Sequence, residues 1–130
     1  MDIVSALFTE NFNMRQAPGP STRIDLTGVM FSMASPSPVP VTIEPHLIVL
    51  IRCRPDEPGQ ATLEVVFTDE KGAEVARNAS PFTVEPGKFT YRLVRAELTY
   101  DTYGTVEAHC RINAGPATVV PLTLLPPAAP

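Results

Sequence analysis

The chain has 130 residues, of which 44% are hydrophobic and 18% are charged, and its formal net charge is −4. This length suits one domain, and the apolar share is enough for an ordinary core, which argues against wholesale disorder. Ten basic residues face fourteen acidic ones without any basic run, so neither a nucleic acid nor an anionic membrane surface is an expected partner. Fifteen prolines and no tryptophan point away from a helical protein.

Apolar and polar residues alternate with a period of two along most of the chain, which is the pattern of β-strands. Turn residues separate the strands, and the longest breaks are a polar loop closing at residues 17–20 and a proline-rich connector at residues 35–40. The expected strands, in chain order, cover residues 3–8, 23–33, 46–54, 62–68, a ragged strand from 73 with a break near 78 and a short piece at 82–84, then 89–98, 105–112 and 117–124.

Short strands at this spacing predict a single antiparallel β-sandwich of about seven or eight strands, immunoglobulin-like or C2-like in architecture. We expect the sandwich to occupy residues 1–125 and a short, extended, proline-rich tail to occupy residues 126–130. No apolar run approaches the roughly 20 residues of a bilayer span, so no membrane span is expected.

The start of the chain and its cysteines indicate a compartment. Asp2 stands where a secretory signal peptide would carry a basic residue, so the expected location is cytoplasmic. In that compartment Cys53 and Cys110 are expected to be two small buried thiols rather than a disulfide.

Candidates for catalysis, metal binding or cofactor binding are few. His109 occupies an outward strand position and His46 opens a strand, and two histidines alone are too few ligands for a metal. Cys110 points to the face opposite His109, so these neighbours do not form a nucleophile–base pair. The glycines stand singly at turns, which excludes a glycine-rich phosphate loop. We therefore expect no enzyme, no metal and no cofactor.

The strand predicted at residues 46–54 is unusually apolar on both faces. If the odd-numbered residues of this strand face the core, Ile48 and Leu50 face outward, where a strand with one wet face should not carry large aliphatic side chains. Met30 is predicted to point outward in the same way. Two explanations stay open: the proline-rich connector or the tail covers this face, or Met30, Ile48 and Leu50 form a contact surface for a protein partner or a second copy of the chain.

Aromatic residues near position 100 suggest a second kind of site. Tyr100, Asp101 and Tyr103 lie in one predicted loop and could bind a small ligand or carbohydrate by stacking and hydrogen bonding. The competing explanation is structural, because tyrosines at the corner of a sandwich commonly pin a loop through a hydroxyl-to-backbone bond.

The chain resembles a family of small, uncharacterised bacterial β-sandwich proteins of unknown function. The resemblance spans most of the sequence and rests on strand and turn patterns: Ala6-Leu7-Phe8, Ile24-Asp-Leu-Thr-Gly-Val29, His46-Leu-Ile-Val-Leu-Ile-Arg52, Pro58-Gly59 and Phe67-Thr-Asp-Glu-Lys-Gly72. It implies the sandwich fold and implies no catalytic residues.

The expected function is a non-catalytic protein–protein interaction module, such as an adaptor, accessory subunit or assembly component. Such a module would dock through an apolar sheet face or a sheet edge. The alternative is a small-ligand or carbohydrate-binding sandwich that uses the Tyr100–Tyr103 loop.

Overall fold

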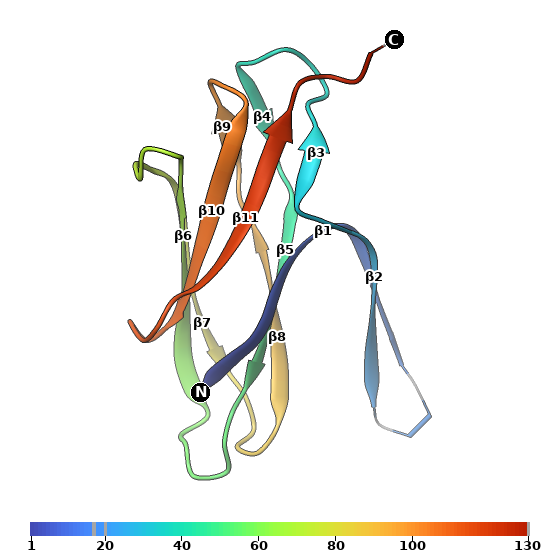
Figure 1. The fold of residues 1–130 in the computed structure, drawn as a ribbon. Coiled ribbons are helices and arrows are strands. Elements are labelled where there is room, and N and C mark those ends of the chain that lie inside the picture. The colour runs from blue at the N-terminus through green and yellow to red at the C-terminus, as the bar shows by residue number, and fades with distance from the viewer. Residues whose placement is uncertain (17, 20, 130) are drawn as a thin grey trace.

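Two β-sheets packed face to face form the body of the protein (Figure 1). The computed structural model describes residues 1–16, 18–19 and 21–129, and this part of the chain contains eleven strands and no helix. Sheet A has the strand order β2 (Thr22–Met30), β1 (Asp2–Gln16), β5 (His46–Arg52) and β8 (Phe89–Arg95). Sheet B has the order β3 (Ser32–Ala34), β11 (Thr118–Leu125), β10 (Gly104–Ile112), β6 (Gln60–Thr68) and β7 (Glu74–Thr83). A small third sheet pairs β4 (Val41–Ile43) with β9 (Leu98–Tyr100).

This architecture confirms the predicted all-β sandwich. Neighbouring strands are antiparallel, except that β11 and β3 run parallel. The strand number exceeds the prediction because two predicted strands are each divided: residues 23–33 form β2 and β3, and residues 89–98 end in β8 before β9 begins. Residues 41–43, just after the proline-rich connector, add β4.

The core lies between the two sheets and is built from alternate residues of their strands. In β6 and β10 the predicted alternation is confirmed, because the inward side chains are almost completely buried while their neighbours reach the solvent. The largest fully buried side chains of the core are Phe8, Leu47, Ile51, Leu63, Phe67, Leu98, Leu122 and Leu124.

The first strand is much longer than predicted because it changes partner along its length. Residues 2–9 pair with β5, with a register shift between Ile3 and Ser5, and residues 8–16 pair with β2. Beyond the sandwich, residues 10–16 and 22–28 therefore form a two-stranded hairpin, called the arm below, that projects from the body (Figure 1). The prediction of a polar loop after residue 8 was wrong as far as residue 16, because residues 9–16 continue β1. Its closing turn includes positions 17 and 20, which lie outside the described residues.

The turn between β6 and β7 follows the predicted hairpin chemistry. Gly72 adopts a φ of 80°, and the Asp69 carboxylate accepts hydrogen bonds from the backbone N–H groups of Lys71 and Ala73, each at 2.9 Å. The predicted break near Asn78 was wrong, because β6 offers a ladder partner along the whole length of β7. Pro81 is tolerated there because β7 is an edge strand.

Both cysteines are free and buried, as the sequence predicted. Burial raises the pKa of the Cys110 thiol to about 11, which keeps it protonated and unreactive at neutral pH. Within the described residues there is no helix long and apolar enough to cross a membrane.

Candidate functional site

The outer face of sheet A carries a row of large apolar side chains. Along β5, Leu47, Val49 and Ile51 belong to the core, so Ile48 and Leu50 point to the opposite face. Ile48 is only 3% exposed, yet it is not part of the core cluster. The predicted outward orientation of these two residues therefore agrees with the structure.

Strand register explains why Ile48 is covered without being in the core. Its cross-strand neighbours are Leu7 on β1 and Leu93 on β8, and Leu50 lies beside Tyr91. Together with Phe89 at the end of β8, these six side chains are called the apolar outer face: Leu7, Ile48, Leu50, Phe89, Tyr91 and Leu93. Phe89 is 65% exposed and Tyr91 is 40% exposed, so this end of the row is accessible to solvent.

Neither segment expected to cover this surface is held there. In the connector, Val39 N–H donates to the Tyr103 hydroxyl at 3.4 Å, and Ser35 N–H donates to the Leu125 carbonyl at 2.9 Å. These bonds place the connector along sheet B. Residues 126–129 are exposed and extend beyond the end of β11 (Figure 1). The cross-strand neighbours that flank Ile48 are Leu7 and Leu93 of sheet A.

The prediction that Met30 joins this surface was wrong. Met30 pairs with the core residue Phe8 and packs against the core, whereas Val29 and Phe31 are 43% and 68% exposed. The alternation along β2 thus has the opposite phase to the predicted one. Position 31 lies in the break between β2 and β3, where a large aromatic residue does not mark the inward face.

Positive charge accompanies the apolar outer face. Arg52 and Arg95, both exposed, occupy outward positions at opposite ends of the row. The strands of sheet A carry five arginines (Arg15, Arg23, Arg52, Arg92 and Arg95) against three acidic residues (Asp2, Glu10 and Asp25). Since the chain has a net charge of −4, the excess of acidic groups lies elsewhere.

The predicted tyrosine loop does not present an aromatic platform. Tyr100 is 4% exposed within the core, and its hydroxyl donates a hydrogen bond to the Leu122 carbonyl at 3.1 Å. Burial raises the pKa of Tyr100 to about 12. Tyr103 is half-buried and bonded to the connector, and Asp101 is exposed. Tyr100 thus acts as a structural pin rather than as a stacking surface, which corrects its place in the predicted ligand site.

A small cavity of about 250 Å³ lies between this loop and the β6–β7 hairpin. Two of its carboxylates already serve the backbone, because Asp69 caps its own turn and Glu70 accepts from Thr105 N–H at 2.9 Å. A typical small-molecule pocket has a volume of roughly 300–1,000 Å³. The cavity is therefore small, and its polar groups are largely engaged.

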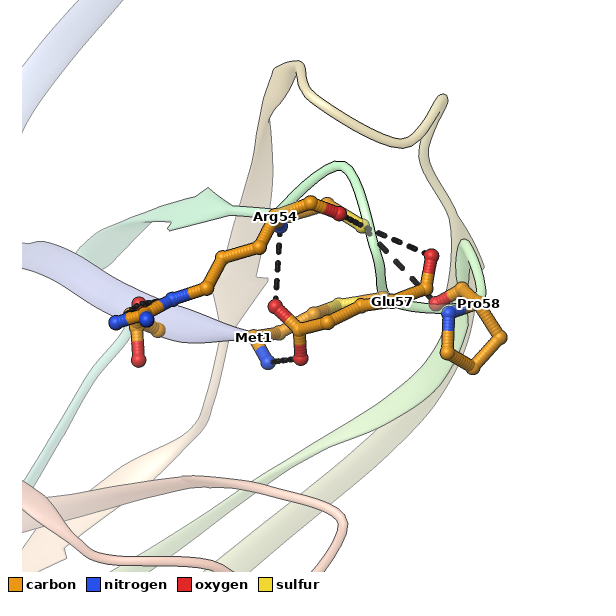
Figure 2. Close-up of polar contacts among 6 residues, drawn as sticks. Met1, Arg54, Glu57 and Pro58 are labelled. Carbon is orange, nitrogen blue, oxygen red and sulfur yellow. Dashed lines mark hydrogen bonds and ion pairs between the residues drawn. The ribbon is translucent and has the colours of Figure 1, made fainter.

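A charged cluster closes the end of sheet A where the chain begins (Figure 2). The Met1 ammonium group is bonded to the Glu57 carboxylate, whose other oxygen accepts from Arg54 N–H at 3.0 Å. The Arg54 guanidinium in turn pairs with Asp2 at 3.0 Å. The Met1 ammonium lowers the pKa of Glu57 through its hydrogen bond. These charges neutralise one another and tie β1 to the loop after β5, which is a structural role.

The histidines are far from forming a metal centre. His109 Nε2 lies 3.0 Å from the Thr68 hydroxyl, and the His46 ring packs edge-on against Phe12 with 5.5 Å between centroids. No group of three or more His, Cys, Asp or Glu residues is arranged to hold a metal in the part of the chain that the structure describes.

Comparisons with known proteins add no identity: no family model matches the chain, and a search of curated proteins also found no match. The family resemblance and the function therefore remain predictions. The sequence singled out Ile48 and Leu50, but it missed Leu7, Tyr91 and Leu93. Their contribution depends on which strands are neighbours and in which register, and single-strand periodicity does not contain that information.

Proposed function

We propose that this protein is a non-catalytic protein–protein interaction module whose docking surface is the apolar outer face of sheet A. The observation that supports this most is the outward-facing apolar row around Ile48, in which Phe89 is 65% exposed and Tyr91 is 40% exposed. Contiguous apolar surface of this kind marks interaction sites in soluble proteins.

The proposed occupant is a protein partner that combines apolar with acidic side chains. Its apolar groups would cover Leu50, Phe89 and Tyr91 around the buried Ile48, and its carboxylates would meet Arg52 and Arg95 at the ends of the row. Such an arrangement has the apolar centre and polar rim of a typical interface, with Tyr91 as an amphipathic anchor. The two buried free thiols are consistent with a reducing compartment such as the cytoplasm.

Affinity capture from a lysate of the source organism tests the proposal. Tagged native protein and its Ile48→Lys variant are compared, and the retained proteins are identified by mass spectrometry. The proposal predicts one specific protein that is retained by the native chain and lost with the variant. Equal retention by both chains, or retention of nothing specific, would count against it.

The second candidate function is binding of a small polar ligand at the cavity beside the Tyr100–Tyr103 loop. The observation in its favour is the cavity itself, with Asp101 and Thr102 in its lining. A ligand screen by thermal shift with native protein and Asp101→Ala tests it, because a ligand of this cavity should stabilise the native chain more than the variant.

A further inference from the structure

The hairpin arm presents a second surface that the proposed function does not use. Within the described structure β2 packs extensively on β1 alone, and its other edge pairs with no strand. Edge strands commonly carry lysine or proline, which discourage pairing with another chain. The nine residues of β2 contain neither. This edge carries the charges of Arg23 and Asp25 but no lysine or proline, so it is open to pairing with a strand of complementary charge.

One face of the arm is apolar. Phe12 lies opposite Leu26, and Met14 lies opposite Ile24, so these four half-buried side chains share one face of the two-stranded ribbon. An isolated two-stranded hairpin is marginally stable in water, and further strands with a common apolar face stabilise it. The arm thus gains stability if its sheet is extended.

The charges on the other face are arranged unfavourably within one chain. Arg15 and Arg23 are directly opposite each other, and like charges in that position repel. Asp25 pairs with Arg15 at 2.7 Å, and Arg23 has no acidic partner among the described residues. A carboxylate next to Arg23 is what the arm lacks.

We propose that the arm binds a second copy of this chain, with β2 pairing antiparallel to β2 of the second copy about a two-fold axis centred on Ile24. An axis perpendicular to the arm keeps both apolar faces on one side and places one β2 residue opposite itself. Centring on Arg23 or Asp25 would oppose like charges. Centring on Ile24 instead places each Arg23 opposite Asp25 of the other copy and supplies the missing carboxylate.

The same pairing extends the apolar face without electrostatic penalty. The strand order of the joined arms is β1-β2-β2-β1, and Phe12, Met14, Ile24 and Leu26 of both copies line one face. The arm contains Glu10, Arg15, Arg23 and Asp25, so it is neutral and the −4 charge of the chain lies elsewhere. The paired strand has only nine residues, so the dimer should be weak and concentration-dependent.

Disulfide trapping tests the register directly. In Ile24→Cys the two introduced thiols face each other across the axis, whereas in Leu26→Cys each thiol faces Thr22 of the other copy. Cys53 and Cys110 are fully buried, so the native chain provides the background. Mild oxidation followed by non-reducing electrophoresis should give a covalent dimer with Ile24→Cys and little with Leu26→Cys. No dimer from Ile24→Cys, or equal dimer from both variants, would overturn the proposal.

Sedimentation of the full chain over a range of concentrations provides the second readout. Arg23→Glu turns two attractive contacts into two repulsive ones and should weaken the dimer about tenfold or more, with unchanged circular dichroism. Ile48→Lys should leave the dimer intact. A dimer that survives Arg23→Glu but is lost in Ile48→Lys would place self-association on the apolar outer face and overturn the arm proposal, while leaving that face as a docking surface.

Discussion

The two sheets of this sandwich have very different outer faces. On sheet B, polar side chains pair across neighbouring strands: Thr105 with Thr123 at 2.7 Å, and His109 with Thr68 at 3.0 Å. On sheet A, the corresponding row consists of aliphatic and aromatic side chains and has Ile48 at its centre. A sandwich needs apolar residues only on its two inner faces. Sheet B shows that this chain can build a solvated outer face, so the apolar face of sheet A is not a general requirement of the sandwich.

The largest expected effect separates the inner from the outer side of β5. Val49→Lys places an unpaired charge in the core and should cost at least about 3–5 kcal/mol, enough to unfold a marginal domain. Ile48→Lys keeps its ammonium group in water while its stem lies along the neighbouring leucines, and should cost about 1–2 kcal/mol. Urea unfolding monitored by circular dichroism measures both. Equal loss of folding would make Ile48 a core residue and remove the contrast between the two faces.

Alkaline pH should lower the free energy of unfolding through two buried groups between the sheets, Tyr100 and Cys110. Burial raises the pKa of Tyr100 from 10.0 to about 12 and that of Cys110 from 9.0 to about 11. Both groups bind their proton more tightly in the folded state, so their contribution is complete below pH 9 and is lost as the pH rises through 12. Deprotonation of each group should lower the free energy of unfolding by about 2–3 kcal/mol over that range.

Urea unfolding of native protein and Tyr100→Phe at several pH values between 8 and 11.5 checks this loss. The variant should retain the Cys110 part of the pH dependence and lose the Tyr100 part. Identical slopes in the two proteins would show that the Tyr100 hydroxyl does not titrate as a core group.

At neutral pH, Tyr100→Phe tests the structural role of this residue with a smaller effect. Removing the hydroxyl leaves the Leu122 carbonyl without its side-chain donor and should cost about 1 kcal/mol in the free energy of unfolding. Thermal unfolding measures the change. An unchanged free energy of unfolding would show that the Tyr100 hydroxyl does not stabilise the loop, and would favour the loop as a ligand site.

The smallest effect is expected on the outer face of sheet B. Val66 occupies an outward position between His109 and Arg77, so Val66→Lys is the matched counterpart of Ile48→Lys. It should change stability little, because the site is polar and partly solvated. Native gel mobility, corrected for the added charge, should show no change in assembly. A large loss of folding would indicate that the two outer faces are not comparable.

The sequence predicted the fold class and the inward residues of β5, β6 and β10, because strict alternation of apolar and polar residues depends on local periodicity alone. It failed at Met30 and over residues 9–16. There, β1 leaves one partner for another, and the phase of β2 is fixed by pairing with Phe8. Both errors arise from long-range register, which a single sequence does not reveal. Ile48 was identified because local alternation places it on the outward face of its strand. The neighbours that complete its surface were missed because they depend on strand register.

The most direct test of the central claim is a calorimetric titration of the captured partner into three chains: native, Ile48→Lys and Val66→Lys. If the apolar outer face of sheet A is the docking surface, Ile48→Lys should weaken binding by about thirtyfold or more, because it places a charge in the middle of the apolar row. Val66→Lys should bind like the native chain. Unchanged affinity in Ile48→Lys, or a larger loss in Val66→Lys, would contradict the account.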